Sequence, residues 1–373
     1  MRIFLRFLTY LLLLLGSITF LAPLLWMLST GLKPIDQTMT MPPSWIPYRY
    51  FVEKDGTRVE VKPGAPINAP SYVVEIQGER HVVSRPSVVN GQMKQQSANG
   101  EEKLVPVQII QEIPADDQHA WTTITPVAIT NAAWEALPAS SVIRKVAPRW
   151  SNFIEAITAM KQFPRYLRNT LILCILTVVG TVTSSALTAY GFSRIEWRGR
   201  NALFMIALAT MMVPFPVTMV PLYCLFRWLG WIGTLKPLWV GSFFAGAFNV
   251  FLLRQFFMTL PKDISEAARI DGCSEFRIFW QIVLPLCRPA LMVVALFQFM
   301  YTWNDFIGPL IYLTNQEDFT LALGLQFFQS QNGGTEWHYL MAASTLVALP
   351  IIVLFFFTQK TFIEGISMTG IKG

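Results

Sequence analysis

The sequence predicts an all-α integral membrane protein with six transmembrane helices, interrupted between helices 1 and 2 by a small β-rich insertion outside the cytoplasm. Of its 373 residues, 53% are hydrophobic and only 14% are charged, whereas an average soluble domain has about 25% charged residues. Six apolar runs are long enough to cross a bilayer, which needs roughly 20 residues per helix. A polar stretch with strand-like alternation separates the first run from the second.

The first apolar run follows Arg2 and Arg6 and so has the outline of a secretory signal. Its apolar core is too long for a typical signal, and no small-residue cleavage site follows, so we expect a retained anchor. The six expected spans are Phe7–Leu28, Leu167–Tyr190, Ala202–Tyr223, Pro237–Leu253, Ala290–Leu313 and Tyr339–Thr358.

Lysine and arginine gather on one side of this topology. The side that holds both termini and the loop 260–288 carries Arg2, Arg6, Arg194, Arg198, Arg200, Arg254, Lys262, Arg269, Arg277, Arg288, Lys360 and Lys372. The short loops on the opposite side carry Arg227 and Lys236. By the positive-inside rule, both termini are cytoplasmic. The same bias accounts for the net charge of +6, so that charge calls for no nucleic-acid partner.

The expected domains are 1–47, with the first helix and an outer-face segment, the insertion 48–148, the five-helix core 149–359, and a cytoplasmic tail 360–373. In the insertion, Tyr50–Val52 and Arg58–Val61 flank Asp55-Gly56, and Tyr72–Ile76 and Arg80–Val83 flank Gln77-Gly78, which predicts two hairpins. Leu104–Ile113 and Trp121–Thr130 are further strand candidates, and a proline in each favours an edge position. None of the four cysteines lies in the insertion. Partner docking and a lineage-specific decoration remain equally open roles for it.

The core shows two departures from regular helix. Trp150–Arg168 is amphipathic and predicts a helix on the outer face that leads into the second span. The third span contains Pro214, Pro216 and Pro221, which exclude a continuous helix. Such a break is tolerated in a membrane where the freed backbone groups face protein or water, so it indicates either a kinked helix lining a pathway or a packing kink.

The fifth span holds Trp303-Asn304-Asp305, the carboxylate deepest within an apolar run. A charge at a helix centre costs about 2.5–3.5 kcal/mol on insertion scales. We therefore expect Asp305 to face the bundle interior, to lie near the outer interface or to be protonated. Pro214, Asn304 and Asp305 are the translocation-path candidates. For Asp305, an inter-subunit role is also open, and the alternative to both is a structural hydrogen bond that fixes helix packing.

The polar loop 260–288 reads as two short helices and a turn. Pro261 and Asp263 are expected to open the first helix, and Gly272 can adopt the left-handed conformation that closes it. Ser274 is expected to cap the second helix, and Pro285 to stop it. Ala267 and Ala268 would leave a low surface for another protein.

Several kinds of chemistry are missing from the sequence. No GxxxxGK[ST] segment that could hold ATP phosphates occurs. No nucleophile–base set gathers, and His81, His119 and His338 are too scattered for a metal site. Intramembrane ionisable residues are too few for a proton or sodium relay. We therefore expect a protein without cofactor or catalytic residues that receives energy from a partner.

The loop resembles the EAA loop of ABC-importer permeases, whose pattern is EAA-x3-G-x9-I-x-L-P. Glu266, Ala267 and Ala268 match the start, Gly272 the glycine, and Ile282, Leu284 and Pro285 the end. The segments STGLKPIDQTMTMPPSWIP, FPRYLRNTLILCILTVVGTVTSSALTAY, ATMMVPFPVTMVPLY and WNDF are similar to carbohydrate-uptake permeases of the maltose and glycerol-phosphate type, and the ending GISMTGIKG is similar to the tail of the maltose-type second permease. The resemblance covers about 1–47 and 149–373 and leaves the insertion out.

The resemblance implies a type I ABC-importer permease in a bacterial inner membrane. The implied partners are a different permease subunit, a dimer of ATPase subunits that bind ATP and Mg²⁺, and an extracytoplasmic solute-binding protein. It implies that the first loop helix seats in the ATPase and that ATP-driven closure rotates the permease core. The implied coupling residues are Glu266, Ala267, Ala268, Arg269, Asp271, Gly272, Leu284 and Pro285, and the implied ATPase-contacting tail residues are Gly370, Lys372 and Gly373.

Other readings remain open on sequence alone. The solute could be a polyol, a phosphorylated polyol or another small molecule rather than a sugar. The chain could also be a membrane-anchored enzyme with its site in 48–148, or a scaffold that keeps the loop to tether an ATPase. The insertion lacks a convergent nucleophile–base set, which disfavours the enzyme.

Overall fold

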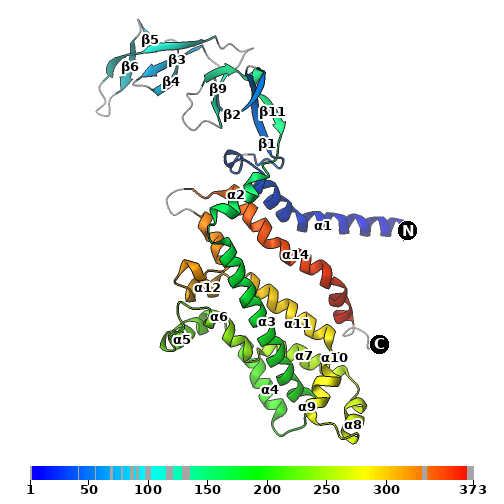
Figure 1. Ribbon diagram of the computed structural model, residues 1–373. Helices are drawn as coiled ribbons and strands as arrows, with labels where there is room; N and C mark the ends of the chain where they lie inside the picture. Colours follow the sequence, from blue (N-terminus) through cyan, green and yellow to red (C-terminus); the bar gives the residue numbers. More distant parts are fainter. Residues whose placement is uncertain are drawn as a thin grey trace. The chain divides into compact units, whose positions relative to one another are not determined.

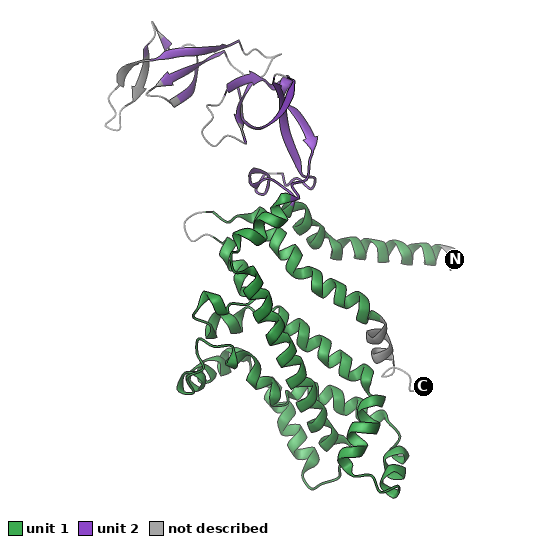
Figure 2. Ribbon diagram, viewed as in Figure 1, with its two compact units in different colours: residues 1–31, 151–373 green, residues 32–150 purple. Residues whose placement is uncertain are grey.

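The computed structural model describes residues 2–40, 42–54, 56–67, 70–76, 79–84, 88–89, 92–96, 102–114, 121–127, 135–329 and 334–367. The chain divides into two compact units (Figure 2). The helical unit comprises Met1–Gly31 and Ser151–Gly373, and the β unit comprises Leu32–Trp150. The β unit therefore begins before and ends after the insertion expected at 48–148.

The helical unit is built from long apolar helices and short connecting ones (Figure 1). Its helices are α1 Arg2–Gly31, α2 Ser151–Ala159, α3 Phe163–Ser193, α4 Arg200–Ala209, α5 Phe215–Trp228, α6 Lys236–Trp239, α7 Ala247–Thr259, α8 Lys262–Ile270, α9 Glu275–Ile278, α10 Leu284–Leu286, α11 Arg288–Trp303, α12 Ile307–Tyr312, α13 Leu321–Gly324 and α14 Trp337–Ser367. Within the described residues, 4 helical stretches are long and apolar enough to cross a membrane, or up to 6 if each of two bent pairs counts as one span.

The expected third span is not one helix. α4 and the 3₁₀ turn Thr210–Met212 meet α5 at 97°, a bend much larger than a kink. Pro214 is extended and caps α5, while Pro216 occupies its first turn, where a proline's missing N–H costs nothing. Pro214 and Pro216 thus stand at the break in the span, whereas Pro221 lies inside α5 and does not end that helix. The break between α4 and α5 is sharper than the kink expected from the sequence.

The expected fifth span is also divided, because α11 ends at Trp303 and α12 begins at Ile307. The expected fourth span spreads over α6, a 3₁₀ turn and α7. The amphipathic segment predicted at 150–168 contains α2, which ends at Ala159, and the first turns of α3.

Two apolar clusters hold the helical unit together. One joins the last turns of α3 to α4, α7, α9 and α11, with Leu253, Phe257 and Ile278 fully buried. The other joins α2, the first half of α3 and α14 around Tyr166 and Trp303. Each end of α3 therefore packs in a different apolar cluster, and α3 connects the two clusters of the helical unit.

The β unit has three antiparallel sheets in the part that the structure describes. Their orders are β10-β9-β2-β1-β11, β4-β3-β8 and β5-β6-β7. The strands are β1 Tyr48–Lys54, β2 Thr57–Ile67, β3 Ser71–Ile76, β4 Glu79–Ser84, β5 Val88–Val89, β6 Gln92–Gln96, β7 Glu102–Pro106, β8 Gln108–Ile113, β9 Trp121–Pro126, β10 Glu135–Pro138 and β11 Ile143–Val146. Small cores form around Val52, Val61 and Ile124 and around Val73 and Ile113.

The sequence predicted the local pairing better than the strand positions. Both expected hairpins are present, with Lys54 opposite Thr57 and Ile76 opposite Glu79. The candidate Leu104–Ile113 divides into β7 and β8, which are edge strands. The edge position expected for Trp121–Thr130 is wrong, because β9 pairs with both β2 and β10. Pro126 is its last residue, so the missing N–H falls at the strand end.

Candidate functional site

The turn between α8 and α9 is closed by backbone geometry that only glycine adopts easily. Gly272 has φ +81°. Its N–H donates to the carbonyl of Arg269 at 3.0 Å, and the N–H of Cys273 donates to that of Ala268 at 2.9 Å. These two bonds form a Schellman motif, which satisfies the last carbonyls of α8. The left-handed conformation expected for Gly272 at the end of α8 is confirmed.

The return from the turn begins with a side-chain cap. The hydroxyl of Ser274 accepts from the N–H of Arg277 at 3.4 Å, as an N-cap residue does. The chain stays helical through a π-helical turn at Phe279–Val283 and through α10. It then bends by 79° into α11. Pro285 therefore does not stop the helix itself, because the helical run passes through it and ends at Leu286.

A carboxylate clamps the two loop helices to α3. Oε1 of Glu275 accepts from Arg269 Nε at 2.6 Å, and Oε2 accepts from the hydroxyl of Tyr190 at 2.7 Å. The hydrogen bond from Arg269, and then that from Tyr190, lower the pKa of Glu275. Because both partners of the ion pair are about 42% exposed, solvent screening limits its strength. We call Arg269, Glu275 and Tyr190 the loop clamp.

Two arginines join α3 and α7 reciprocally behind the clamp. Arg194, which follows α3, donates from Nη2 to the carbonyls of Phe257 and Leu260, each at 2.6 Å. Arg254 of α7 donates from Nε to the carbonyl of Phe192 at 3.1 Å. Each arginine thus satisfies carbonyls that the other helix leaves unpaired at its C-terminal end. These bonds hold the ends of α3 and α7 together as the base of the loop.

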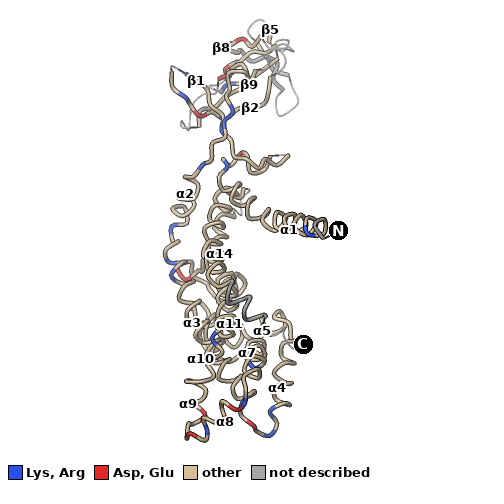
Figure 3. Tube along the Cα trace, turned by 90° about the vertical axis from the view of Figure 1, so that its right-hand side faces the viewer, with Lys and Arg blue, Asp and Glu red and all other residues tan. Residues whose placement is uncertain are grey.

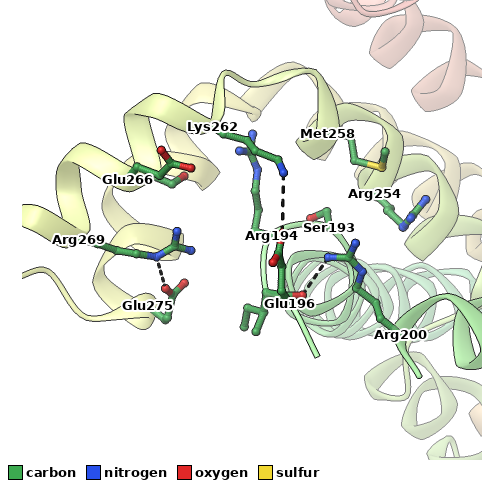
Figure 4. Close-up of a pocket in the computed structure, with 12 residues that line it drawn as sticks. Ser193, Arg194, Glu196, Arg200, Arg254, Met258, Lys262, Glu266, Arg269 and Glu275 are labelled. Atoms are coloured by element: carbon green, nitrogen blue, oxygen red, sulfur yellow. Dashed lines mark hydrogen bonds and ion pairs between the residues drawn. The ribbon is translucent and has the colours of Figure 1, made fainter. Parts of the chain in front are cut away.

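The loop and this base enclose a polar hollow of about 480 Å³ (Figure 4). Glu266 and Arg269 of α8 line one side of it. Lys262 lies 3.8 Å from Glu196, the ion pair that links the start of α8 to the segment after α3. In Figure 3, basic and acidic positions alternate along the trace around α8 and α9. The sides of this open hollow are connected by a few ion pairs and hydrogen bonds.

The outward surface of α8 and its turn mixes charge with exposed apolar side chains. Glu266, Ala267 and Asp271 are exposed. Ile270, beside the turn, is 88% exposed, and Phe276 is exposed and stacks on Trp280. Exposed apolar side chains therefore lie among charged residues on the same loop.

The low surface expected from Ala267 and Ala268 is only half correct. Ala267 is exposed, whereas Ala268 is buried in the cluster of α3, α7 and α9. Adjacent residues of a helix point about 100° apart, so the pair cannot share one face. Ala268 instead lets α8 lie close to the core. Leu284 packs against the same cluster, and Pro285 is exposed.

The translocation-path candidates occupy helix ends. Oδ1 of Asp305 accepts from the N–H of Gly308 at 3.0 Å at the start of α12. Nδ2 of Asn304 donates to the carbonyl of Met300 at 2.8 Å. This bond links residues three positions apart and does not join Asp305 to another helix, so the path role and the packing role both stay predictions. Within the described part of the chain, no hydrogen bond joins Pro214 to Asn304 or Asp305. The tail residues Gly370, Lys372 and Gly373 lie outside the described residues.

A family model for the binding-protein-dependent transport system inner membrane component matches residues 170–367. That match includes α8, the Gly272 turn and α9, and it covers more than half of the chain. The chain belongs to this family. It is therefore a membrane transport permease and not an enzyme.

Curated relatives of the permease carry names of sugar transporters. It is 37% identical over 213 residues to the arabinooligosaccharides transport system permease protein AraQ of Bacillus subtilis, covering 56% of this chain and 74% of that protein. It is 34% identical over 212 residues to the trehalose/maltose transport system permease protein MalG of Thermococcus litoralis, covering 57% and 76%. A bacterial ABC transporter involved in the import of alginate shares the fold, with a TM-score of 0.53 and 24% identity over 58% of this chain and 80% of that chain.

Sequence reasoning missed the residues that fix the loop of the permease. Glu275 could have been found as an acid in the first turn after the Ser274 cap, six residues after Arg269. Tyr190 and Arg194 gave no local signal, because their partners are 85 and 63 or more residues away in the chain.

Proposed function

We propose that this permease is one of two different membrane subunits of an ATP-driven importer for a sugar or oligosaccharide. The α8 helix and the Gly272 turn dock on a partner ATPase and carry its closure to the membrane helices. The observation that supports this most is the exposed Ile270 beside a turn whose base is hydrogen-bonded to α3 and α7. The sugar-transporter names of the relatives support the solute class.

The hydrogen bonds and ion pairs around the loop suit the transmission of a movement of α8 to the membrane helices. A push on α8 passes through Glu275 to Tyr190 and through the Lys262–Glu196 pair to the end of α3. Arg194 and Arg254 link α3 to α7, so both helices move together. Since α3 is one helix of 31 residues, it is about 45 Å long and reaches across a bilayer.

We propose six spans in the type I importer arrangement: α1, α3, α4 with α5, α6 with α7, α11 with α12, and α14. The lysine and arginine bias supports a cytoplasmic loop and cytoplasmic termini. α8 contacts the C-terminal end of α3, whereas α2, which begins at Ser151, packs against its N-terminal end. If the loop is cytoplasmic, the chain that enters α2 from the β unit lies on the other side of the membrane, which supports a β unit outside the cytoplasm. The further partners are a second permease, an ATPase dimer that binds ATP and Mg²⁺, and a solute-binding protein.

Co-purification tests the docking surface. The tagged chain is expressed with the ATPase and permease subunits of its own transporter, and the Ile270→Asp variant is compared with Ile154→Asp, whose isoleucine is 69% exposed on α2. We expect wild type and Ile154→Asp to recover the ATPase, and Ile270→Asp to lose it while still inserting. Equal recovery by both variants contradicts docking through the turn. Uptake of labelled maltotriose and arabinotriose by the same cells tests the solute class.

A further inference from the structure

A second hollow of about 480 Å³ lies beside the first turns of α3, at the end of that helix opposite α8. Three glutamines and three aromatic rings contribute to its lining: Gln316, Gln326, Gln329, Tyr166, Phe319 and Phe327. Tyr166 and Phe319 lie 6.2 Å apart between ring centres and form the apolar side. Phe327 is 55% exposed, and the three glutamines are exposed. No acidic or basic side chain is among the lining residues.

This combination matches the chemistry of a neutral saccharide. A sugar ring presents a C–H face that packs on an aromatic ring and a rim of hydroxyl groups that both donate and accept hydrogen bonds. A side-chain amide offers a carbonyl acceptor and two N–H donors. An anionic solute would find no lining charge to pair with, and an unpaired charge is costly to remove from water. The volume falls within the range of about 300–1,000 Å³ usual for small-molecule sites.

The hollow is held in shape by α3. Nδ2 of Asn169, which is buried, donates to the carbonyls of Glu317 at 3.0 Å and Phe319 at 3.1 Å. The hydroxyl of Thr170 accepts from the N–H of Leu321 at 2.9 Å. A Cβ at Gly324 would lie 2.5 Å from the ring of Tyr166, so only glycine permits this packing. These contacts hold residues 317–324, between Gln316 and Gln326, against α3. Order already present in that segment lowers the entropy cost of binding.

We infer that this hollow, named here the Tyr166 hollow, is a saccharide subsite that binds a sugar ring of a neutral oligosaccharide at the extracytoplasmic mouth of the permease. The inference rests on the proposed sugar importer and its orientation. Phe327 supplies an exposed stacking face, and Gln316, Gln326 and Gln329 bind hydroxyl groups. Because α3 extends from the Tyr166 hollow to the loop clamp, ATPase-driven movement of α3 would alter the subsite.

Binding of maltotriose and arabinotriose to the full chain in detergent, followed by saturation-transfer NMR and titration, tests the subsite. Removal of one aromatic stacking face in Phe327→Leu is expected to raise Kd about 3- to 10-fold. The double variant Gln316→Ala, Gln329→Ala is expected to weaken binding further. Phe20→Leu, at a phenylalanine that is 88% exposed on α1, is the matched control and keeps the wild-type Kd. An unchanged melting temperature confirms that each variant is folded.

The result that overturns the subsite is an unchanged Kd in both Tyr166-hollow variants, or no binding of either trisaccharide to the wild-type chain. Uptake by cells with the whole transporter separates this failure from failure of the proposed function. Sugar uptake that depends on Ile270 but not on Phe327 removes the subsite and keeps the importer. Absence of sugar uptake by the wild type removes the proposed solute class.

Discussion

Substitution of Gly272 gives a quantitative test of the proposed role of the α8–α9 turn in coupling, because an added Cβ at this position would contact no other heavy atom. No heavy atom lies within 4 Å of a Cβ built on Gly272, while its φ of +81° is unfavourable for L residues. Substitution therefore introduces backbone strain without a steric clash. The left-handed conformation costs roughly 1–2 kcal/mol for an ordinary L residue, less for asparagine and more for a β-branched residue. We predict the order Gly, Asn, Ala, Val from best to worst.

The assay is uptake of labelled trisaccharide by cells that express the whole importer, with membrane insertion followed in parallel. A strain of 1–2 kcal/mol lowers the population of the native turn relative to its alternatives about 5- to 30-fold. We therefore expect uptake to fall by up to that factor in Gly272→Val, with Gly272→Asn nearest to wild type. Gly16→Val is the control, because Gly16 is helical and also has open space. Full uptake by Gly272→Val would refute this account of the turn.

Two further predictions concern the supports of the turn, and a third concerns the β unit. Glu275→Gln should weaken the loop clamp and increase hydrogen exchange in α8. The pKa of Glu275 is lower in the folded protein than in the unfolded chain. The stabilisation that the Glu275 carboxylate gives the loop is therefore fully present above the unfolded pKa of about 4.3 and is lost as pH falls through the folded pKa. Hydrogen exchange in α8 that stays insensitive to acid below pH 4 would contradict this. Arg194→Ala leaves the carbonyls of Phe257 and Leu260 without their donor and should lower the free energy of unfolding by about 1–3 kcal/mol. The melting temperature should fall in this variant and stay unchanged in the control Arg198→Ala. Equal melting temperatures in the two variants would contradict a stabilising role for the Arg194 hydrogen bonds. Replacing residues 33–149 by a short linker should leave an inserted helical unit, because Asn152 Nδ2 bonds the carbonyl of Gly31 at 2.9 Å, and loss of insertion would make the β unit part of the core.

Local signals in the sequence predicted the loop well. Gly272 and Ser274 act through backbone conformation and short-range capping, which depend on neighbours within a few residues. The β1–β2 and β3–β4 hairpins were predictable for the same reason. The resemblance carried by Glu266 to Pro285 agrees with the family match to residues 170–367.

The features that could not be predicted from the sequence depend on contacts between residues far apart in the chain. Ala268 faces the core because α3 and α9 pack there, and no local pattern specifies that side of α8. The internal position of β9 depends on β2, whose residues lie about 60 positions earlier. Asp305 lies at a helix boundary because α11 ends at Trp303, which an unbroken apolar run does not reveal.

Site-specific photocrosslinking from the position of Ile270 in the assembled transporter tests the central claim most directly. A photoreactive residue there, in membrane vesicles, is predicted to crosslink to the ATPase subunit, while the same residue at Ile154 is not. Crosslinks from position 270 to lipid or to the second permease alone, with the ATPase present, would contradict a docking role for the Gly272 turn.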